Sequence, residues 1–341
     1  MQNSLGLTMN KYILLLALFF SLHQISADTF SVMTMNVENL FDAKDDYGKD
    51  DKAFLPLSMK SSKDHINSCQ RIRVNKCKNE CLFLDWNDAA KNAKLQNIVK
   101  TITLYENVGP DIIFFQEVEN KNILKQLFLL LSTYGYVDFD LIEGNDYRGI
   151  DNAVISKYPI IDSKLHYIEF SGKYSDKDTR PILNALININ NKNIRFYGVH
   201  FPAPYHNYQM REQAFLSLNQ LLKNYREPSI ALGDFNVTSE EAINKNMFIN
   251  HESLWDIAHH NVCNECFGTY YYPPDNNWSF LDSILVAKNR NLSLIVDSVI
   301  LLKTPINMDK NNYKPISFST DNYRGVSDHI PLVAKIKISD L

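Results

Sequence analysis

Apolar and polar residues in this chain follow the two-residue period of strands in some stretches and the helical period of about 3.6 residues in others. Residues 30–37 alternate well enough to form a strand, and residues 91–105 place their apolar side chains on one helical face. The continuous apolar run 112–115 is typical of a strand covered on both faces. A helix is predicted over residues 121–132. The first half of the chain therefore alternates strands with helices.

Strand pairs dominate the second half of the chain. Strands are predicted over residues 148–158, 181–186, 194–199, 229–232, 282–287 and 332–338, with a helix over residues 209–223. No internal repeat and no Gly/Ser-rich linker divides the body of the chain. The pattern predicts one α/β (α+β) domain of two packed mixed β-sheets flanked by helices.

The N-terminus has the features of an export signal. Lys11 precedes the apolar run 12–22, and Ser26-Ala27 offers small residues for cleavage, so a signal peptide is predicted over residues 1–27. The apolar run is too short to span a bilayer, which makes an uncleaved anchor the less favoured alternative. We expect a secreted or periplasmic protein that is not stably inserted in a membrane.

Residues 42–88 are charged, Lys-rich and cysteine-containing, with no clear periodicity. They predict a long insertion, from about residue 42 to 88, in a single domain of residues 28–341. The five cysteines are Cys69, Cys77, Cys81, Cys263 and Cys266. In an exported chain disulfides are the first expectation, and an odd count leaves one thiol over. Cys263-Asn-Glu-Cys266 also has zinc-ligand spacing, so zinc stays an alternative and the pairing stays open.

Composition narrows the function classes. With 341 residues and 45% hydrophobic content the chain can bury a large core. The formal net charge of −4 argues against a general polyanion-binding scaffold, so any contact with nucleic acid must be local. The chain lacks a phosphate-binding Gly-rich loop, a Gly-x-Ser-x-Gly elbow and a His-Glu-x-x-His helix.

Polar side chains follow several predicted strands at the point where each strand ends. Asp234 and Asn236 come directly after an apolar strand and Gly233, and Asn36 and Glu38 repeat this spacing at the end of the first strand. Open α/β sheets keep their chemistry at such ends, although Asx turns produce the same residues for structural reasons. Glu117 follows the apolar run 112–115 by two residues, and a lone Glu with an amide nearby is how Mg²⁺ prefers to be held.

Two histidines and an internal acid extend this set. Asp282 enters an apolar strand, where an unpaired carboxylate would be costly, so it requires a cationic or imidazole partner. Asp328-His329 would supply a metal-facing acid and a titratable base beside it. His200 lies at a strand end and can be either functional or an ordinary buried side chain. The aromatic run 270–274 can stack on a base or form a rim of packed rings.

Together these strand ends resemble the endonuclease/exonuclease/phosphatase superfamily, whose best-known members are deoxyribonuclease I and the abasic-site endonucleases. The matching runs occur in the family's order at residues 35–40, 115–117, 199–200, 233–237, 280–282 and 327–329. The resemblance implies a four-layered α/β/β/α sandwich with a divalent-metal site at one edge of two facing sheets.

The resemblance also implies a role for each matching residue. Asn36 and Glu117 resemble the main metal ligands, with Asp328 close to the metal and Glu38 available for a second metal site. Mg²⁺ is the implied cofactor, with Mn²⁺ or Ca²⁺ as alternatives. His329 resembles the catalytic histidine, oriented by Asp282, and Asp234 resembles the group that positions or deprotonates the attacking water. Asn236 and Arg180 resemble phosphate contacts. His200 resembles a group that stabilises the pentavalent state or protonates the leaving group.

Three functions follow as hypotheses. The first is an exported, metal-dependent phosphodiesterase that cleaves DNA or RNA as an endonuclease and acts as a monomer. The second is a sphingomyelinase-like or other small-substrate phosphodiesterase or phosphatase; inositol-phosphate phosphatases are disfavoured because Phe280-Leu281-Asp282-Ser283 does not match their Pro-Ala-Trp-Cys-Asp-Arg signature. The third is a non-catalytic secreted protein that keeps the fold, and it is disfavoured because every expected catalytic position is filled.

Overall fold

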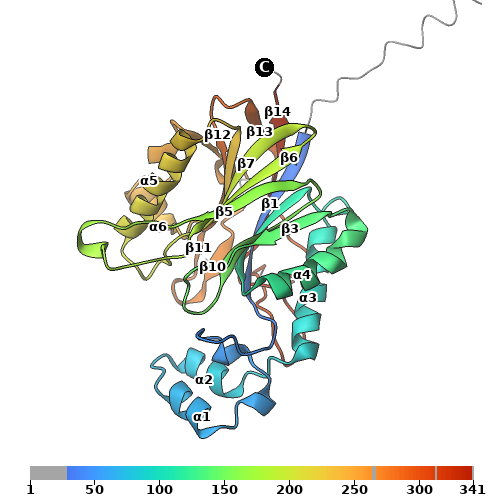
Figure 1. Ribbon diagram of the computed structural model, residues 1–341, viewed down its shortest axis with the longest axis vertical. Coiled ribbons are helices and arrows are strands. Elements are labelled where there is room, and N and C mark those ends of the chain that lie inside the picture. The colour runs from blue at the N-terminus through green and yellow to red at the C-terminus, as the bar shows by residue number, and fades with distance from the viewer. Residues whose placement is uncertain (1–28, 263–265, 312, 340–341) are drawn as a thin grey trace, which may run out of the picture.

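Two six-stranded sheets form the body of the molecule in a computed structural model that describes residues 29–262, 266–311 and 313–339 (Figure 1). The first sheet has the order β13-β14-β1-β2-β4-β3. Its strands are β1 (Thr29–Leu40), β2 (Ile112–Val118), β3 (Asp138–Leu141), β4 (Asp151–Ser156), β13 (Leu292–Leu301) and β14 (Leu332–Ile338).

The second sheet has the order β5-β6-β7-β8-β12-β9. Its strands are β5 (Ile160–His166), β6 (Ile182–Ile189), β7 (Lys192–His200), β8 (Ser229–Asp234), β9 (Trp255–Ile257) and β12 (Asp282–Ala287). A separate hairpin of β10 (Tyr270–Tyr272) and β11 (Asn277–Ser279) touches the body through a backbone bridge between Tyr270 and His329.

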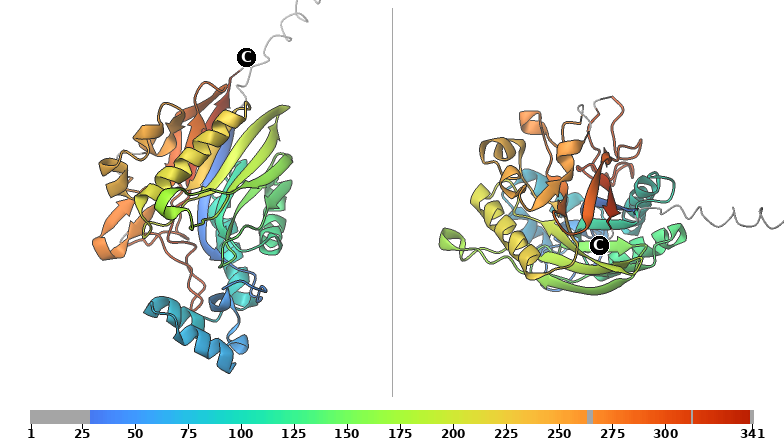
Figure 2. Two further views of the ribbon diagram at one scale, coloured as in Figure 1. Left: turned by 60° about the vertical axis from the view of Figure 1, so that its left-hand side comes forward. Right: turned by 90° about the horizontal axis from the view of Figure 1, so that it is seen from above.

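Helices cover the outer face of each sheet. The apolar faces of α3 (Asp88–Thr103) and α4 (Lys121–Leu131) pack on the first sheet, and α5 (Tyr208–Asn224) and α6 (Ser239–Asn244) pack on the second. A third apolar cluster lies between the two sheets. Figure 2 shows the resulting layers, and the predicted α/β/β/α sandwich is confirmed.

The predicted helices begin where the sequence provides caps. The side chains of Asn87, Asn120 and Asn207 accept hydrogen bonds from the first backbone amides of α3, α4 and α5. The helices predicted over 91–105, 121–132 and 209–223 are therefore confirmed, with boundaries shifted by a few residues.

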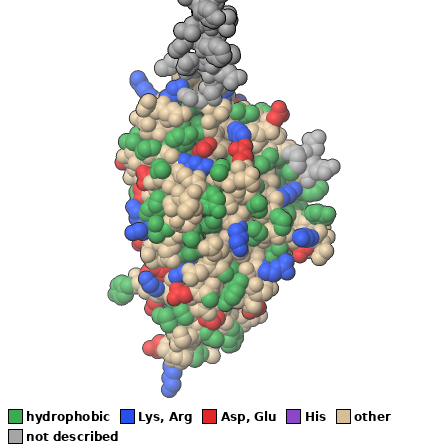
Figure 3. Space-filling model, turned by 90° about the vertical axis from the view of Figure 1, so that its right-hand side faces the viewer, with side chains coloured by type: hydrophobic (Ala, Val, Ile, Leu, Met, Phe, Trp, Pro, Cys, Tyr) green, Lys and Arg blue, Asp and Glu red, His purple; other side chains and the backbone are tan. Residues whose placement is uncertain are grey.

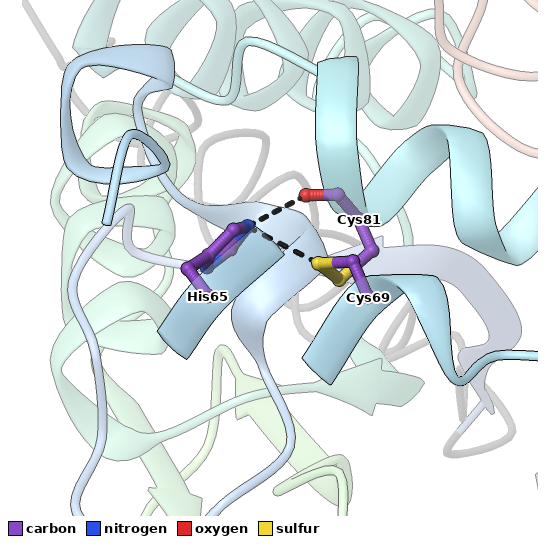
Figure 4. Close-up of side chains that lie close together, drawn as sticks. All are labelled: His65, Cys69 and Cys81. Carbon is purple, nitrogen blue, oxygen red and sulfur yellow. Dashed lines mark hydrogen bonds between the residues drawn. A yellow bond between two sulfur atoms is a disulfide. The ribbon is translucent and has the colours of Figure 1, made fainter. Parts of the chain in front are cut away.

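The insertion predicted from residue 42 to 88 contains two helices, α1 (Lys63–Gln70) and α2 (Asn75–Phe83), which project from one end of the sandwich (Figure 1). A disulfide between Cys69 and Cys81 joins them. Figure 4 shows His65 beside it, with Nε2 2.9 Å from the Cys81 carbonyl oxygen and 3.2 Å from Cys69 Sγ. Because both sulfurs are in the disulfide, this pair is not a zinc site. Among the cysteines that the structure describes, Cys77 is free and exposed.

Several expectations concern parts of the chain that the structure does not describe. The predicted signal peptide, residues 1–27, and Cys263 lie outside the described residues. Within the described ranges no helix is long and apolar enough to cross a membrane. On the face shown in Figure 3, basic and acidic side chains are interspersed, as the small net charge leads one to expect.

Candidate active site

The parallel strand pairs bring the predicted polar residues to one end of the sandwich. Each sheet contains one such pair, β1 with β2 and β7 with β8. In register, Asn36 faces Gln116 and His200 faces Asp234. β12 runs antiparallel to β8 and places Asp282 opposite Asp234. Strand β1 runs towards α1 and α2, so the site lies at the end of the sandwich that faces the insertion (Figure 1).

Asn36 links the two sheets at this end. Its Nδ2 donates hydrogen bonds to Glu117 Oε1 at 3.3 Å and to Asp234 Oδ2 at 3.1 Å. Its Oδ1 accepts from the backbone N–H of Glu38 at 2.9 Å. One buried amide therefore positions a carboxylate from each sheet.

The strand ends that carry the site have left-handed backbone. Glu38, Asn39, Glu117 and Asn236 have φ angles of 50°, 65°, 65° and 55°. This conformation is unfavourable for residues other than glycine, by about 1–3 kcal/mol each, and persists where surrounding contacts impose it. Two such contacts are present: Asn39 N donates to Glu117 Oε2 at 3.0 Å, and Lys94 Nζ donates to the Glu38 carbonyl at 2.5 Å.

His329 and Asp282 form a buried pair, with Nδ1 of the imidazole 2.7 Å from Oδ2 of the carboxylate. Although burial alone would lower the pKa of His329, the Asp282 carboxylate raises it well above its usual value. The ring is therefore protonated near neutral pH. Its Nε2 lies 4.0 Å from Asp234 Oδ2 and 3.9 Å from Asp328 Oδ1.

His200 has the opposite charge state. Burial, reinforced by the charges of Arg180 and Arg148, lowers its pKa well below the usual value, so the ring is neutral. Nδ1 has no hydrogen-bond partner in the part of the chain that the structure describes, which favours the tautomer with the proton on Nε2. That atom lies 3.6 Å from Asp234 Oδ2 and 3.9 Å from Glu117 Oε1.

Asp234 lies between the two histidines. Burial and the nearby Asp282 raise its pKa to about 7. Its Oδ1 accepts the backbone N–H of Asn236 at 2.8 Å. A carboxylate whose pKa lies near neutrality can take up a proton during a reaction.

Three further carboxylates, those of Glu38, Glu117 and Asp328, lie beside Asp234 and the two histidines. Asp328 N donates to Glu38 Oε2 at 3.1 Å, and burial, followed by the charge of Asp328, raises the pKa of Glu38 to about 7. Lys94 offsets part of the negative charge of Glu38, Glu117 and Asp328, and burial lowers the pKa of its amine to about 8. Carboxylate oxygens with an amide nearby suit a hard divalent cation.

A second group of residues also has metal-ligand spacing. The ligand atoms of Asp234, Asp282 and His329 all lie within 4.8 Å of one another. The hydrogen bond between the last two residues already uses Oδ2 of Asp282 and Nδ1 of His329. This set therefore suits proton transfer better than metal binding, while Glu38, Glu117 and Asp328 remain the better cation donors.

The predicted phosphate-binding residues meet at the end of β7. Arg180 Nη2 and Asn236 Nδ2 each donate to the carbonyl of Phe201 at 2.9 Å, and Arg180 Nε donates to the carbonyl of His200 at 3.3 Å. Arg180 also lies 3.5 Å from Asp146. All predicted site residues thus lie at this end of the sandwich.

Three supporting residues were not predicted. Ser327 Oγ donates to the Asn36 carbonyl at 2.7 Å and accepts from His329 N at 3.0 Å, and Thr269 Oγ1 accepts from Asp282 N at 3.1 Å. Lys94 is 1% exposed. A lysine beside the apolar face of a predicted helix was a signal that could have identified it.

The chain matches a known protein family. The family model described as "Endonuclease/Exonuclease/phosphatase family" matches residues 79–329. The chain belongs to this family. The resemblance of the strand ends is thereby confirmed, and members of the family hydrolyse phosphoesters and typically use divalent metals. No curated protein is similar enough in sequence to count as a match.

Solved structures share the fold at low sequence identity. A family protein from Bacteroides thetaiotaomicron is 16% identical, with a TM-score of 0.56 over 92% of this chain and 98% of that one. Humanized TDP2 of D. rerio is 14% identical, with a TM-score of 0.53 over 91% and 99%. The mannosyl-6-phosphatase of B. thetaiotaomicron is 15% identical, with a TM-score of 0.52 over 90% and 99%.

Proposed function

We propose that this protein is an exported, divalent-metal-dependent phosphodiesterase that cleaves DNA or RNA as an endonuclease. The observation that carries the proposal is the arrangement around Asp234, which lies between a protonated His329 and a neutral His200. A proton acceptor flanked by two hydrogen-bond donors suits attack of water on a phosphodiester.

The donor set at the neighbouring carboxylates fits a hard metal. Glu38, Glu117 and Asp328 offer oxygen ligands. Burial and the charge of Asp328 raise the pKa of Glu38, and a divalent cation would offset both effects. Asn36 would contribute its amide oxygen or hold the carboxylates in place. Mg²⁺ is the proposed metal, with Mn²⁺ and Ca²⁺ as alternatives. When bound, such a metal withdraws charge from the phosphoryl oxygens.

The protein side chains account for the proton movements. Asp234 in its ionised form accepts a proton from the attacking water, and His329 gives the Nε2 proton to the leaving oxygen. His200 donates its Nε2–H to a non-bridging oxygen, which gains charge in the transition state. Asn236 and Arg180 contribute further donors. Removal of one such donor typically costs about 2.7–4 kcal/mol of barrier.

Exposed aromatic and basic side chains near the site support a nucleic-acid substrate. Tyr147 and Tyr205 are 68% and 84% exposed, and they are close enough to influence each other electrostatically. Arg148 adjoins Tyr147 in the chain, and its charge acts on His200. Exposed rings can stack on bases while arginines contact phosphates. A D. rerio TDP2 structure of the same fold contains a single-strand DNA product.

A phosphatase or phosphodiesterase acting on a small substrate is the second candidate. It is favoured by the mannosyl-6-phosphatase of the same fold. Its sphingomyelinase-like form would require a membrane contact, for which Phe267 and Tyr272, 69% and 47% exposed, are available near the β10–β11 hairpin.

Export is supported by the N-terminal signal pattern and by the Cys69–Cys81 disulfide. Disulfides persist in secreted and periplasmic proteins and are rare in the reducing cytosol.

The test is a comparison of substrates. Purified protein is incubated with plasmid DNA, RNA, sphingomyelin, mannose 6-phosphate and bis-p-nitrophenyl phosphate, with Mg²⁺ or with chelator, beside a His329→Ala control. Metal-dependent nicking of the plasmid or cleavage of RNA that disappears in the control supports the nuclease. Turnover of the lipid or sugar phosphate alone supports the second candidate, and no turnover of any substrate contradicts both.

A further inference from the structure

A second group of acidic residues lies outside the proposed catalytic set, where the start of the insertion meets the end of β2. Asp51 and Glu119 are 1% and 2% exposed, and Asp42 is 4% exposed. Asp42, Asp46 and Asp51 all repel the charge of Glu119. Burying several carboxylates together is unfavourable unless a cation or hydrogen bonds compensate.

In each of the two most buried carboxylates of this group, only one oxygen accepts a hydrogen bond from the described residues. Asp51 Oδ2 accepts from Asp46 N at 2.7 Å, and Glu119 Oε2 accepts from Asp42 N at 2.6 Å. The other oxygens, Asp51 Oδ1 and Glu119 Oε1, have no hydrogen-bond partner among the described residues. Each carboxylate thus has one oxygen fixed by the backbone and one available to a ligand.

Two nearby lysines, Lys49 and Lys121, have other partners. Lys49 donates to the carbonyl of Asp146 at 2.9 Å, and Lys121 pairs with Asp140 at 2.6 Å. A surface hollow of about 510 Å³ reaches Asp42 and Asp46, whose backbone amides donate hydrogen bonds to Glu119 and Asp51.

We propose that Asp51 and Glu119, with Asp42 and Asp46 around them, bind a structural Ca²⁺ ion. All the donors are oxygens, which selects a hard cation. No three of the described acidic residues here have ligand atoms that all lie within 4.8 Å of one another. At most two of these carboxylates can therefore contact the ion directly, and backbone carbonyls and water would complete its shell. Ca²⁺ takes 6–8 oxygens at about 2.3–2.6 Å in flexible geometry and accepts carbonyls and water among them, whereas Mg²⁺ demands a near-ideal octahedron.

The ion would connect the insertion to the catalytic end of the sandwich. Glu119 follows Glu117 by two residues and is held to β1 by a 3.0 Å hydrogen bond from its N–H to the Leu40 carbonyl. Asp51 belongs to the segment that leads into the insertion. The site is independent of the proposed hydrolysis, because none of its ligands belongs to the proposed catalytic set.

The test uses the full chain, freed of metal with chelator, dialysed and titrated with CaCl₂ alone by calorimetry. Asp51→Asn and Glu119→Gln keep the shape of each side chain and its backbone hydrogen bond. The matched control is Asp50→Asn, whose exposed carboxylate pairs with Lys52 at 3.0 Å. We expect the unsubstituted protein and Asp50→Asn to bind one more Ca²⁺ than either Asp51→Asn or Glu119→Gln. Equal stoichiometry in all four proteins overturns the proposal.

Thermal unfolding gives a second readout. At 100 times Kd, Ca²⁺ should raise Tm by about 5 °C, and this shift should vanish in Asp51→Asn and Glu119→Gln. Should either fail to fold, Asp328→Asn decides, since it leaves this site intact. Asp328→Asn should keep the Ca²⁺-dependent Tm shift. Loss of the shift in this variant would assign the ion to the proposed catalytic carboxylates and overturn the proposal.

Discussion

The imidazole Nδ1 of His329 lies 2.7 Å from the Oδ2 of Asp282, and both side chains are buried. Asp282 begins a strand of the second sheet, whereas His329 precedes a strand of the first. The pair therefore forms only when the two sheets pack together. Asp282 accepts a hydrogen bond from the Nδ1–H of His329. Nε2 of the same ring is therefore left facing Asp234.

Replacing Asp282 with Asn should lower activity by a factor of about 10²–10³, the size of a lost transition-state donor. The amide cannot stabilise the imidazolium, so His329 loses its proton at neutral pH. His329→Ala should have a similar effect. Because the two act as a unit, the double variant should be little worse than either single one. Single-turnover rates on a phosphodiester measure this, and additive losses would show that the residues act independently.

Activity should rise with pH through about 7. Asp234 has a pKa raised to about 7, and only its ionised form can accept a proton from water. Below that pH the carboxyl is protonated and the rate falls; above it the rate levels off until His329 loses the proton that it gives to the leaving oxygen. The measurement is kcat/KM from pH 5 to 9 at fixed metal and ionic strength, with Asp234→Asn as an inactive control. A flat profile over this range would contradict the role of Asp234.

Lys94→Met should destabilise the fold by about 3–5 kcal/mol, as when one partner of a buried charge group is removed. The substitution takes away the cation that offsets Glu38, Glu117 and Asp328 and the donor to the Glu38 carbonyl.

Lys91→Met, on the same helix, is the matched control. Lys91 pairs with Asp88, whose side chain is 83% exposed, so its loss should cost about 1 kcal/mol or less. Urea denaturation in chelator compares the two. Equal losses would mean that Lys94 acts through packing alone.

Gly233→Ala should disrupt the β7–β8 pair and abolish most of the activity. Gly233 has a φ of +146°, and an added Cβ would lie 2.0 Å from the Val199 carbonyl oxygen. The strands would have to separate, which would move His200 and Asp234 apart.

Gly172→Ala separates backbone strain from steric overlap. Gly172 has a φ of +62° and open space around it, so its replacement should cost about 1 kcal/mol and leave activity intact. Tm and kcat of the two variants provide the comparison; similar effects would show that strain rather than overlap dominates at Gly233.

The local pattern of the sequence determined most of the secondary structure and indicated which polar residues would meet at one end of the sandwich. Alternating apolar residues predicted β1, and helical periodicity with asparagine caps accounts for α3, α4 and α5. Polar residues at strand ends predicted the candidate site, because parallel strands in one sheet end at the same edge, and the family resemblance suggested the role of each residue. These features depend on neighbours in the chain, which the sequence displays directly.

The tertiary structure alone decided how these residues interact. The Asn36 amide links Glu117 with Asp234, and burial beside different charges makes His329 cationic and His200 neutral. The Cys69–Cys81 pairing and the roles of Lys94 and of the Asp51 and Glu119 carboxylates likewise appeared only in the folded chain. Desolvation and Coulomb interaction depend on distances between residues remote in sequence, and only the packing of the two sheets and the insertion sets those distances.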